Sequence, residues 1–518
     1  MLRMPGAALL LLAAFAGIPA AAQTLAPPEQ RGKQIYLDGA ERAVAFVGRD
    51  DTKLPASRMP CAGCHGRDGA GRAEGGIVPP DITWGRLTKP YTQRHANGRT
   101  HPPYDEASLL TAITQGRDPA GNALDPTMPR YRLEPQQAQD LIAYLKKLER
   151  EQDRGIAEDT ILVGTVVPAD GRAAAAGQDV LRVLQAYFDD VNRTGGIFQR
   201  RIVLKVEAYR GNETPAAAAM RLIDAGVFAL VAPFAVGAQA ELQALAEKHE
   251  TPVLGPFVLL PRGSNSAQRH MFFLTTALED QARALLTYAR TRLNLDDPRI
   301  AVVIPPGPGF SGVAQAITQE GRNQGWGRIS THEAAERGEV LAPLVATLRA
   351  DGVDAVFYMG GAPGLDAFVT AVALQGWSPK LFAPGASLGP NLSVGLGMLG
   401  KPIFASFPTM QSDRKEAGVM ELRRLHVHDG GAARFSIAEI SAYAAARVFV
   451  EGLRRTGRAL TRSKLVTALE GLSQFETGLL PSISFGASRR FAATGSHILA
   501  IDAHGRSVAS SEAWIAPE

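Results

Sequence analysis

Beyond residue 158, short apolar runs alternate along the chain with longer stretches in which apolar residues recur at every third or fourth position. A short run rich in Val, Ile and Leu predicts a buried strand, and a 3.6-residue repeat predicts an amphipathic helix. Strands are therefore expected over 161–167, 201–208, 228–232, 253–254, 299–304 and 355–359, and helices over 177–194, 214–225, 238–249, 280–293, 312–325 and 341–350.

Repeated alternation of strands and helices predicts parallel sheets that are covered by helices on both faces. The stretch 159–518 is long for a single sheet, so we expect a domain of two α/β lobes there. The residues immediately before it, 151–158, are charged and lack apolar periodicity, which is typical of a linker.

The N-terminus has a different pattern. One arginine precedes an apolar run over 6–18, and the run ends in Ala20-Ala21-Ala22. This pattern predicts a secretory signal peptide over 1–22, because the run is too short to span a bilayer and small residues precede the cleavage site. The expected location is the periplasm, with no membrane span in the mature chain; a retained N-terminal anchor is the alternative.

Between the signal peptide and the linker, two helices are expected, over 28–38 and 134–149. The first carries Gly32 and Tyr36 on one face, and the second carries Tyr144 within an apolar stripe. A glycine followed four residues later by an aromatic residue lets two helices cross closely, so these helices are expected to pack together.

Composition narrows the possible classes of protein. The chain has 518 residues, of which 45% are hydrophobic and 20% charged, so it can bury several cores and is neither disordered nor fibrous. A net charge of +4 gives no argument for nucleic acid or for an anionic membrane surface. Two cysteines cannot build a disulfide framework, so their role must be sought in their spacing.

The two cysteines lie in Cys61-Ala62-Gly63-Cys64-His65. At this C-x-x-C-H spacing two thiols can bind one haem covalently while the histidine coordinates the iron. A redox dithiol is the alternative, but it calls for a preceding strand and for a helix starting at the first cysteine, and neither is expected here. The motif therefore predicts one covalently bound haem c.

The second axial ligand is expected to be Met128, which lies in a loop between Pro126 and Pro129. His95 and His101 are the competitors, and both lie in a polar loop where histidines are usually solvated. An iron with two axial ligands has no open position for a substrate, so the domain is expected to transfer electrons and not to act as an enzyme. A haem enzyme such as a peroxidase would require an open position.

These motifs together resemble a class I c-type cytochrome over residues 28–150, an all-α domain. The resemblance implies that the carbonyl of Pro79 or Pro80 orients the axial imidazole and that Trp84 contacts a haem propionate. The chain departs from the family in a long stretch between Tyr36 and Cys61 and in an insertion over 94–104.

Residues 159–510 resemble the type 1 periplasmic solute-binding proteins, in particular the branched-chain amino acid receptors. The resemblance implies two lobes that are joined by three crossovers, expected near Ala277, Ser406 and Pro481, and that close on a small ligand. It rests on co-linear segments at 162–165, 190–197, 254–256, 273–276, 299–302, 354–357 and 442–445.

The amino-acid binders of that family use hydroxyl groups on two loops and an acidic residue of the second lobe to hold the ligand. Here the loops 234–238 and 256–259 are apolar, and Gly385 stands at the acidic position. Burying both charged ends of an amino acid without partners costs several kcal/mol, so an apolar or aromatic ligand is expected. A vestigial cleft is the alternative. The expected contacts are Phe234, Val236, Phe257, Leu259, Thr275, Thr276, Phe310 and Ser387.

Two other motifs are weaker. Residues 307–312 match G-x-G-x-x-G, but Pro308 removes an amide that a dinucleotide phosphate would need. His426 and His428 could suggest a metal, although alternate histidines before Gly430 are more typical of an exposed loop.

The chain is thus expected to be a multidomain electron carrier that is fused to a small-molecule binder. Its redox partner is expected to be a periplasmic dehydrogenase or a terminal oxidase chain. The alternative is a substrate-binding protein of an ABC-type transporter that docks on a permease and carries an accessory cytochrome domain.

Overall fold

The computed structural model describes residues 25–71, 79–95, 97–148, 153–258, 260–261, 269–307, 309–389, 392–427, 432–504 and 513–516. The expected signal peptide, Leu259, Pro308 and His428 lie outside these residues. The chain divides into two compact units, 1–152 and 153–518. We call them the cytochrome unit and the binding unit, and we describe each by itself. Among the described residues, no helix combines the length and apolar character needed to cross a membrane.

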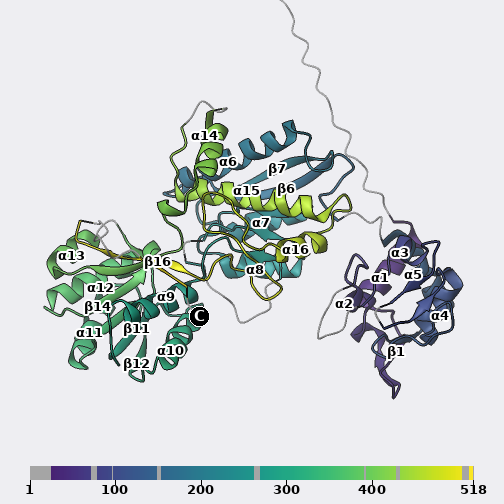
Figure 1. The fold of residues 1–518 in the computed structure, drawn as a ribbon, viewed down its shortest axis with the longest axis horizontal. Coiled ribbons are helices and arrows are strands. Elements are labelled where there is room, and N and C mark those ends of the chain that lie inside the picture. Colours follow the sequence, from purple (N-terminus) through teal and green to yellow (C-terminus); the bar gives the residue numbers. More distant parts are fainter. Residues whose placement is uncertain are drawn as a thin grey trace, which may run out of the picture. The chain divides into compact units, whose positions relative to one another are not determined.

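The cytochrome unit is mainly helical (Figure 1). The unit is not all-α, because part of the long stretch after Tyr36 forms a hairpin of β1 and β2. Strand β1 also pairs with β5, which gives an antiparallel sheet of order β2-β1-β5. A second antiparallel pair, β3–β4, lies in the insertion. The elements are α1 (Pro27–Asp38), β1 (Val44–Val47), β2 (Thr52–Pro55), the 3-10 turn η1 (Ala56–Arg58), α2 (Cys61–His65), α3 (Trp84–Leu87), β3 (Gln93–Arg94), β4 (Thr100–His101), α4 (Glu106–Gln115), β5 (Arg130–Arg132) and α5 (Pro135–Leu148).

Helices α1 and α5 cross as the sequence predicts. Tyr36 and Tyr144 are fully buried, and their ring centroids lie 5.5 Å apart. A side chain at Gly32 would overlap the main-chain carbonyl of Asp140, so only glycine permits this approach. Arg31 binds the Asp140 carboxylate through Nε at 2.7 Å and thereby ties the two helices together at the surface.

The first lobe of the binding unit is a parallel five-stranded sheet of order β10-β9-β8-β6-β7. Val163 and Val167 of β6 belong to a core with α6, α15 and α16, whereas Val166 belongs to a core with α7 and α8, so helices cover both faces. The elements are β6 (Thr160–Pro168), α6 (Ala174–Arg193), β7 (Arg201–Tyr209), α7 (Pro215–Asp224), β8 (Ala229–Val231), α8 (Gln239–Lys248), β9 (Val253–Leu254), β10 (Met271–Phe272), α14 (Glu416–Val427), α15 (Ile437–Thr456) and α16 (Arg462–Glu470).

The second lobe has a seven-stranded mixed sheet of order β12-β11-β13-β14-β15-β16-β17. Its first five strands are parallel, and β16 and β17 are antiparallel to their neighbours. The elements are α9 (Leu278–Thr291), β11 (Ile300–Ile304), α10 (Ser311–Asn323), β12 (Ile329–Glu333), α11 (Gly338–Ala350), β13 (Ala355–Tyr358), α12 (Ala362–Leu374), β14 (Lys380–Pro384), the 3-10 turn η2 (Gly385–Ser387), α13 (Leu392–Leu399), β15 (Ile403–Phe407), the 3-10 turn η3 (Gln411–Asp413), β16 (Ser496–Ile501) and β17 (Ala513–Ile515).

The chain passes between the two lobes three times, and Figure 1 shows that the late helix α15 lies beside the early helix α6 in the first lobe. The crossovers that were expected near Ala277 and Ser406 are confirmed. The passages run from β10 to α9, from β15 to α14, and through 493–495 into β16.

The crossover expected near Pro481 is wrong. Leu480 and Ile483, on either side of Pro481, are buried in the first-lobe core, and the chain stays in that lobe as far as Ala492. Residues 479–492 contain no regular helix or strand, so hydrophobic periodicity offers no marker for the true position of this crossover.

Candidate functional site

The two cysteines lie on one short helix. Helix α2 begins at Cys61 directly after Pro60, and Cys61 is half-buried while Cys64 is exposed. A helix starting at the first cysteine was not expected, but the turn before it, η1, is not the strand that a redox dithiol calls for. Burial raises the pKa of the Cys61 thiol to about 12. Since dithiol exchange depends on a thiolate, this environment opposes redox dithiol chemistry.

The imidazole of His65 is buried and held by its neighbours. Its Nδ1 lies 3.1 Å from the carbonyl oxygen of Pro80, which selects Pro80 over Pro79 as the orienting residue. A carbonyl oxygen only accepts, so Nδ1 carries the proton and Nε2 presents a lone pair. Burial lowers the pKa of His65, which favours the neutral form that can coordinate a metal.

The main chain around His65 is fixed by three hydrogen bonds. The Tyr36 hydroxyl donates to the Gly66 carbonyl at 2.6 Å, and the Tyr131 hydroxyl donates to the Met59 carbonyl at 2.6 Å. The amide of Gly71 donates to the His65 carbonyl at 2.9 Å. These contacts brace the C-x-x-C-H segment from both sides.

Met128 lies in a turn before β5, where its amide donates to the carbonyl of Asp125 at 3.0 Å. It is half-buried and packs against the same core as Cys61. Trp84, on α3, is also half-buried against this core, and Lys146 Nζ lies 5.5 Å from the centroid of its ring. The half-buried apolar side chains of this cluster include Met59, Cys61, Ile82, Trp84, Leu124 and Met128.

This donor set fits a haem. Two free thiols lie one helical turn apart, an imidazole with a fixed tautomer follows, and half-buried apolar side chains surround them. Cys61 and Cys64 would hold the porphyrin and His65 would hold the iron, with Met128 as the expected sixth ligand. The bound group would supply a one-electron ferric/ferrous couple.

The structure corrects the expectation that His95 and His101 are both solvated. His101 is only 2% exposed, and its Nε2 lies 2.8 Å from Nε2 of His95. Its Nδ1 lies 2.7 Å from the carbonyl oxygen of Pro102, so both ring nitrogens of His101 already have partners. This pairing weakens the case for either histidine as a rival to Met128.

In the binding unit, the two loops at the expected ligand position are apolar as predicted. The rings of Phe234 and Phe257 stack with centroids 4.7 Å apart, and Val236 is half-buried against the same first-lobe core. Phe310 is half-buried against a core of the second lobe. The side chains of these loops are thus apolar and none is charged, and the aromatic pair itself is largely buried, with Phe234 3% and Phe257 8% exposed.

Gly385 has no room for the acidic side chain that amino-acid binders carry at this position. A Cβ atom there would lie 2.5 Å from the ring of Phe407 and 2.9 Å from the carbonyl oxygen of Ser406. The position is thus closed by Phe407 as well as lacking a carboxylate.

Two of the three hydroxyl residues expected at the ligand are fully buried and have partners within the protein. Thr276 donates to the carbonyl of Gly495 at 2.6 Å, and Ser387 donates to the carbonyl of Gly360 at 2.6 Å. Their hydroxyl protons are therefore used in the scaffold. Thr275 is half-buried and remains a candidate ligand contact.

The hydrogen bond of Thr276 belongs to a buried network that could not be predicted from the sequence. We call this network the hinge clasp; its members are Thr276, Gln281, Ser406 and Gly495. Gln281 Nε2 donates to the Thr276 carbonyl at 3.2 Å, and the Ser406 hydroxyl donates to Gln281 Oε1 at 3.2 Å. The clasp joins a residue at each of the three crossovers: Thr276 binds Gly495 directly, and Gln281 on α9 links Thr276 to Ser406. Partners as far as 219 residues apart leave no signal in local sequence.

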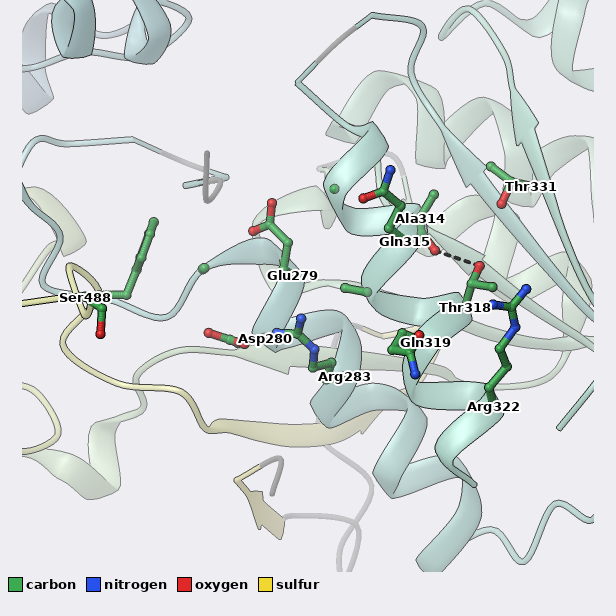
Figure 2. Close-up of a pocket in the computed structure, with 14 residues that line it drawn as sticks. Glu279, Asp280, Arg283, Ala314, Gln315, Thr318, Gln319, Arg322, Thr331 and Ser488 are labelled. Carbon is green, nitrogen blue, oxygen red and sulfur yellow. Dashed lines mark hydrogen bonds and ion pairs between the residues drawn. The ribbon is translucent and has the colours of Figure 1, made fainter. Parts of the chain in front are cut away.

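A solvent-open groove of about 1010 Å³ lies elsewhere in this unit, along α9 and α10 (Figure 2). Its lining is mostly polar, and burial raises the pKa of Asp280, which pairs with Arg283 one turn along α9. Of the expected ligand residues that the structure describes, none lines this groove.

His426 does not lie in an exposed loop, as had been expected. It is on α14, it is 1% exposed, and its Nε2 lies 3.2 Å from Oε1 of the buried Glu439. It therefore belongs to the core between α14 and α15.

Comparison with known proteins agrees with both units. The family model described as periplasmic binding protein matches residues 160–506, and the model described as cytochrome c matches residues 30–149. The Leu/Ile/Val-binding protein BraC3 of Rhizobium johnstonii is 24% identical over 340 residues, which covers 62% of this chain and 87% of that protein.

Solved structures share the fold of the binding unit. A fatty acid ABC transporter substrate-binding protein from Thermomonospora curvata superposes with a TM-score of 0.56 at 15% identity, covering 71% of this chain and 94% of that one. A branched-chain amino acid ABC transporter protein from Thermus thermophilus with bound valine gives 0.53 at 17% identity, covering 68% and 97%. The chain belongs to the periplasmic binding protein family, and a cytochrome c domain precedes its two-lobed binding fold.

Proposed function

We propose that the protein is an exported electron carrier whose cytochrome unit transfers single electrons through one covalently bound haem c. Cys61 and Cys64 hold the haem, and His65 and Met128 are the axial ligands. The observation that carries this proposal is the contact between His65 Nδ1 and the Pro80 carbonyl, because it fixes the tautomer that leaves Nε2 for iron.

Electron transfer is preferred to catalysis at the haem because two axial ligands leave no open coordination position. Met128→Ala tests this assignment. We expect loss of the sulfur-to-iron charge-transfer absorption and a lower midpoint potential. An unchanged spectrum and potential would remove Met128 as a ligand and would favour a haem enzyme with an open site.

The expected signal peptide, 1–22, supports a periplasmic location. There the cytochrome unit receives electrons from a dehydrogenase and passes them toward a terminal oxidase chain. The binding unit brings a substrate, product or signal of that reaction next to the redox partner.

The ligand of the binding unit is a small apolar or aromatic molecule without a zwitterionic end. The stacked pair Phe234–Phe257 supports apolar recognition, and the closure of Gly385 by Phe407 argues against an ammonium site. Val236, Phe257, Leu259, Thr275 and Phe310 are the proposed contacts.

One purification tests both parts. The mass of the intact protein is expected to correspond to one haem, and redox titration is expected to give a single one-electron couple. A thermal-shift screen of aromatic acids, alcohols, aldehydes and fatty acids is expected to stabilise the binding unit, whereas leucine and valine are expected to have no effect. A shift with amino acids alone would contradict the proposed ligand class.

A transport receptor is the second candidate, and the match to a Leu/Ile/Val-binding protein favours it. In that case the binding unit delivers its ligand to a permease and the cytochrome is accessory. Deleting residues 28–150 distinguishes the two. Ligand uptake that is unchanged by the deletion supports the transport receptor. The electron carrier is supported if neither the full-length nor the deleted protein takes up ligand and the deletion abolishes ligand-dependent electron transfer.

A further inference from the structure

The insertion of the cytochrome unit brings two histidines together on a hairpin. Strand β3 pairs with β4, and the His95 amide donates to the Arg99 carbonyl at 2.9 Å across the turn. The two Nε2 atoms lie 2.8 Å apart while the ring centroids are 5.0 Å apart, so the rings meet nearly end to end. An ion between them would need about 2 Å to each nitrogen, so the gap fits a hydrogen bond and not a metal.

The proton positions in this pair follow from its partners. The Pro102 carbonyl only accepts, so His101 carries its proton on Nδ1 and has a bare Nε2. His95 must then donate through Nε2, which leaves its Nδ1 as an acceptor. His95 is half-exposed, and within the described residues no hydrogen bond is found for this Nδ1. An additional proton from solvent therefore binds at His95 Nδ1.

Charged neighbours favour the neutral pair. Burial lowers the pKa of His95, and the positive charge of Arg99 lowers it further, with a smaller contribution from Arg86. Asp118 acts in the opposite direction, but its buried carboxylate is bound to Arg99 Nη1 at 2.6 Å. Tyr104 contacts the His101 ring at a centroid distance of 4.9 Å.

The pair also belongs to the same packed body as the haem ligands. Tyr104 is buried in the core against which Cys61 and Met128 pack, and its amide donates to the Leu87 carbonyl at 3.0 Å. Gln93 Nε2 donates to the Arg86 carbonyl at 2.8 Å and fixes the hairpin on α3. Charges in one small unit of low polarity interact more strongly than charges in water.

We propose that His95 and His101 form a proton-binding site that is linked to the redox state of the haem. A bound haem that gained one electron from a donor would carry one positive charge less, so His95 Nδ1 would bind a proton from water more readily. When the haem passed that electron on to an acceptor, His95 would release the proton to water. This inference rests on the proposed electron-transfer function, and it adds a proton as a second ligand of the unit.

The test uses the full-length holoprotein. Its midpoint potential is measured from about pH 4 to about pH 8, the range in which histidines titrate in proteins. We expect the wild-type potential to fall as the pH rises through the titration of the pair. His95→Gln is expected to remove that dependence, whereas His504→Gln, which removes an exposed histidine of the binding unit, is expected to keep it.

Nitrogen-15 NMR of the imidazoles gives a second readout. In the reduced protein we expect His101 to carry Nδ1–H and His95 to carry Nε2–H. We expect the pKa of His95 to be higher in the reduced protein than in the oxidised protein by a few tenths of a unit. Arg86→Gln is expected to move the break in the potential to higher pH without abolishing it, since it removes a positive charge near His95.

Equal His95 pKa values in both redox states, or a pH dependence that survives His95→Gln, would overturn the linkage. If His95→Gln fails to fold, the NMR comparison and Arg86→Gln still decide the question. The absence of any reversible one-electron couple would instead refute the proposed function. In that case the NMR spectrum would still show whether His95 and His101 have the tautomers expected for the pair.

Discussion

The haem-binding segment and the ligand loops obtain their chemistry in opposite ways. In the haem-binding segment, the two cysteines and His65 lie within one helix of five residues, and the His65 imidazole has a directed partner in Pro80. At the ligand loops, the side chains are apolar and mostly buried, and hydroxyl groups such as that of Thr276 bind the scaffold. A covalently attached cofactor can be specified by one short motif, whereas a pocket between lobes depends on which side chains the tertiary fold leaves free.

The largest expected effect concerns the haem-binding segment. Replacing Cys61 and Cys64 by alanine removes both attachment points, so covalent haem absorbance is expected to be lost completely. The binding unit is a separate compact body, so its thermal transition is expected to stay unchanged in calorimetry. Loss of both transitions would show that the units fold as one.

The helix crossing of the cytochrome unit gives the next effect. Gly32→Ala places a methyl group against the Asp140 carbonyl and is expected to lower the free energy of unfolding by about 3 kcal/mol. The matched control is Gly397→Ala on α13, where a Cβ meets nothing, and it is expected to be neutral or to stabilise its unit by about 0.5 kcal/mol. Equal effects of the two variants in thermal unfolding would argue against the tight crossing.

The hinge clasp is expected to have an intermediate effect. Gln281→Leu leaves the Ser406 hydroxyl and the Thr276 carbonyl without their partner, at about 1–3 kcal/mol. Denaturant unfolding of the binding unit measures the loss, and the haem spectrum serves as an internal control. Thr318→Ala, which removes a half-buried hydroxyl on α10 that binds only a carbonyl of its own helix, is expected to change stability by less than about 0.5 kcal/mol. A neutral Gln281→Leu would show that the clasp does not hold the crossovers.

The smallest effect concerns acid. The Asp413 carboxylate, near the second crossover, accepts a hydrogen bond from His497 Nε2 at 2.9 Å. Desolvation alone would raise the pKa of Asp413, but this hydrogen bond and the one from the Met410 amide bring it below the ordinary value. A pKa that is lower in the folded than in the unfolded state stabilises the fold at pH values above the ordinary aspartate pKa. This stabilisation is lost as the pH falls through the folded-state pKa. Unfolding measured below about pH 4 is expected to show a loss of about 1 kcal/mol that Asp413→Asn lacks.

As far as β13, the strands and helices that local patterns predicted in the binding unit lie close to their expected positions, but no prediction was made for the later elements such as α12 and β14. Strand β6 and helix α6 follow from apolar periodicity, and the haem motif follows from residues within one turn of each other. The close approach at Gly32 could also be predicted, because a glycine and an aromatic residue four positions apart are visible along a single helix.

Tertiary partners could not be predicted in the same way. The burial of His101 depends on a hairpin of two-residue strands, which is too short to leave a period. Ser387 and Thr276 were expected at the ligand because a hydroxyl near a cleft looks available, yet their acceptors lie 27 and 219 residues away. The third crossover was misplaced for a similar reason, since residues 479–492 are held by packing and not by regular structure.

The order in which the two units can be completed follows from how the chain is threaded. The helices of the cytochrome unit end at Leu148, so every contact within that unit is available early as the chain emerges from its N-terminus. The first lobe cannot close so soon, because Phe188 of α6 packs against Phe449 of α15. Haem attachment can therefore precede completion of the binding unit. Until the last fifth of the chain has emerged, the first lobe is incomplete and exposes an apolar face that is prone to aggregation.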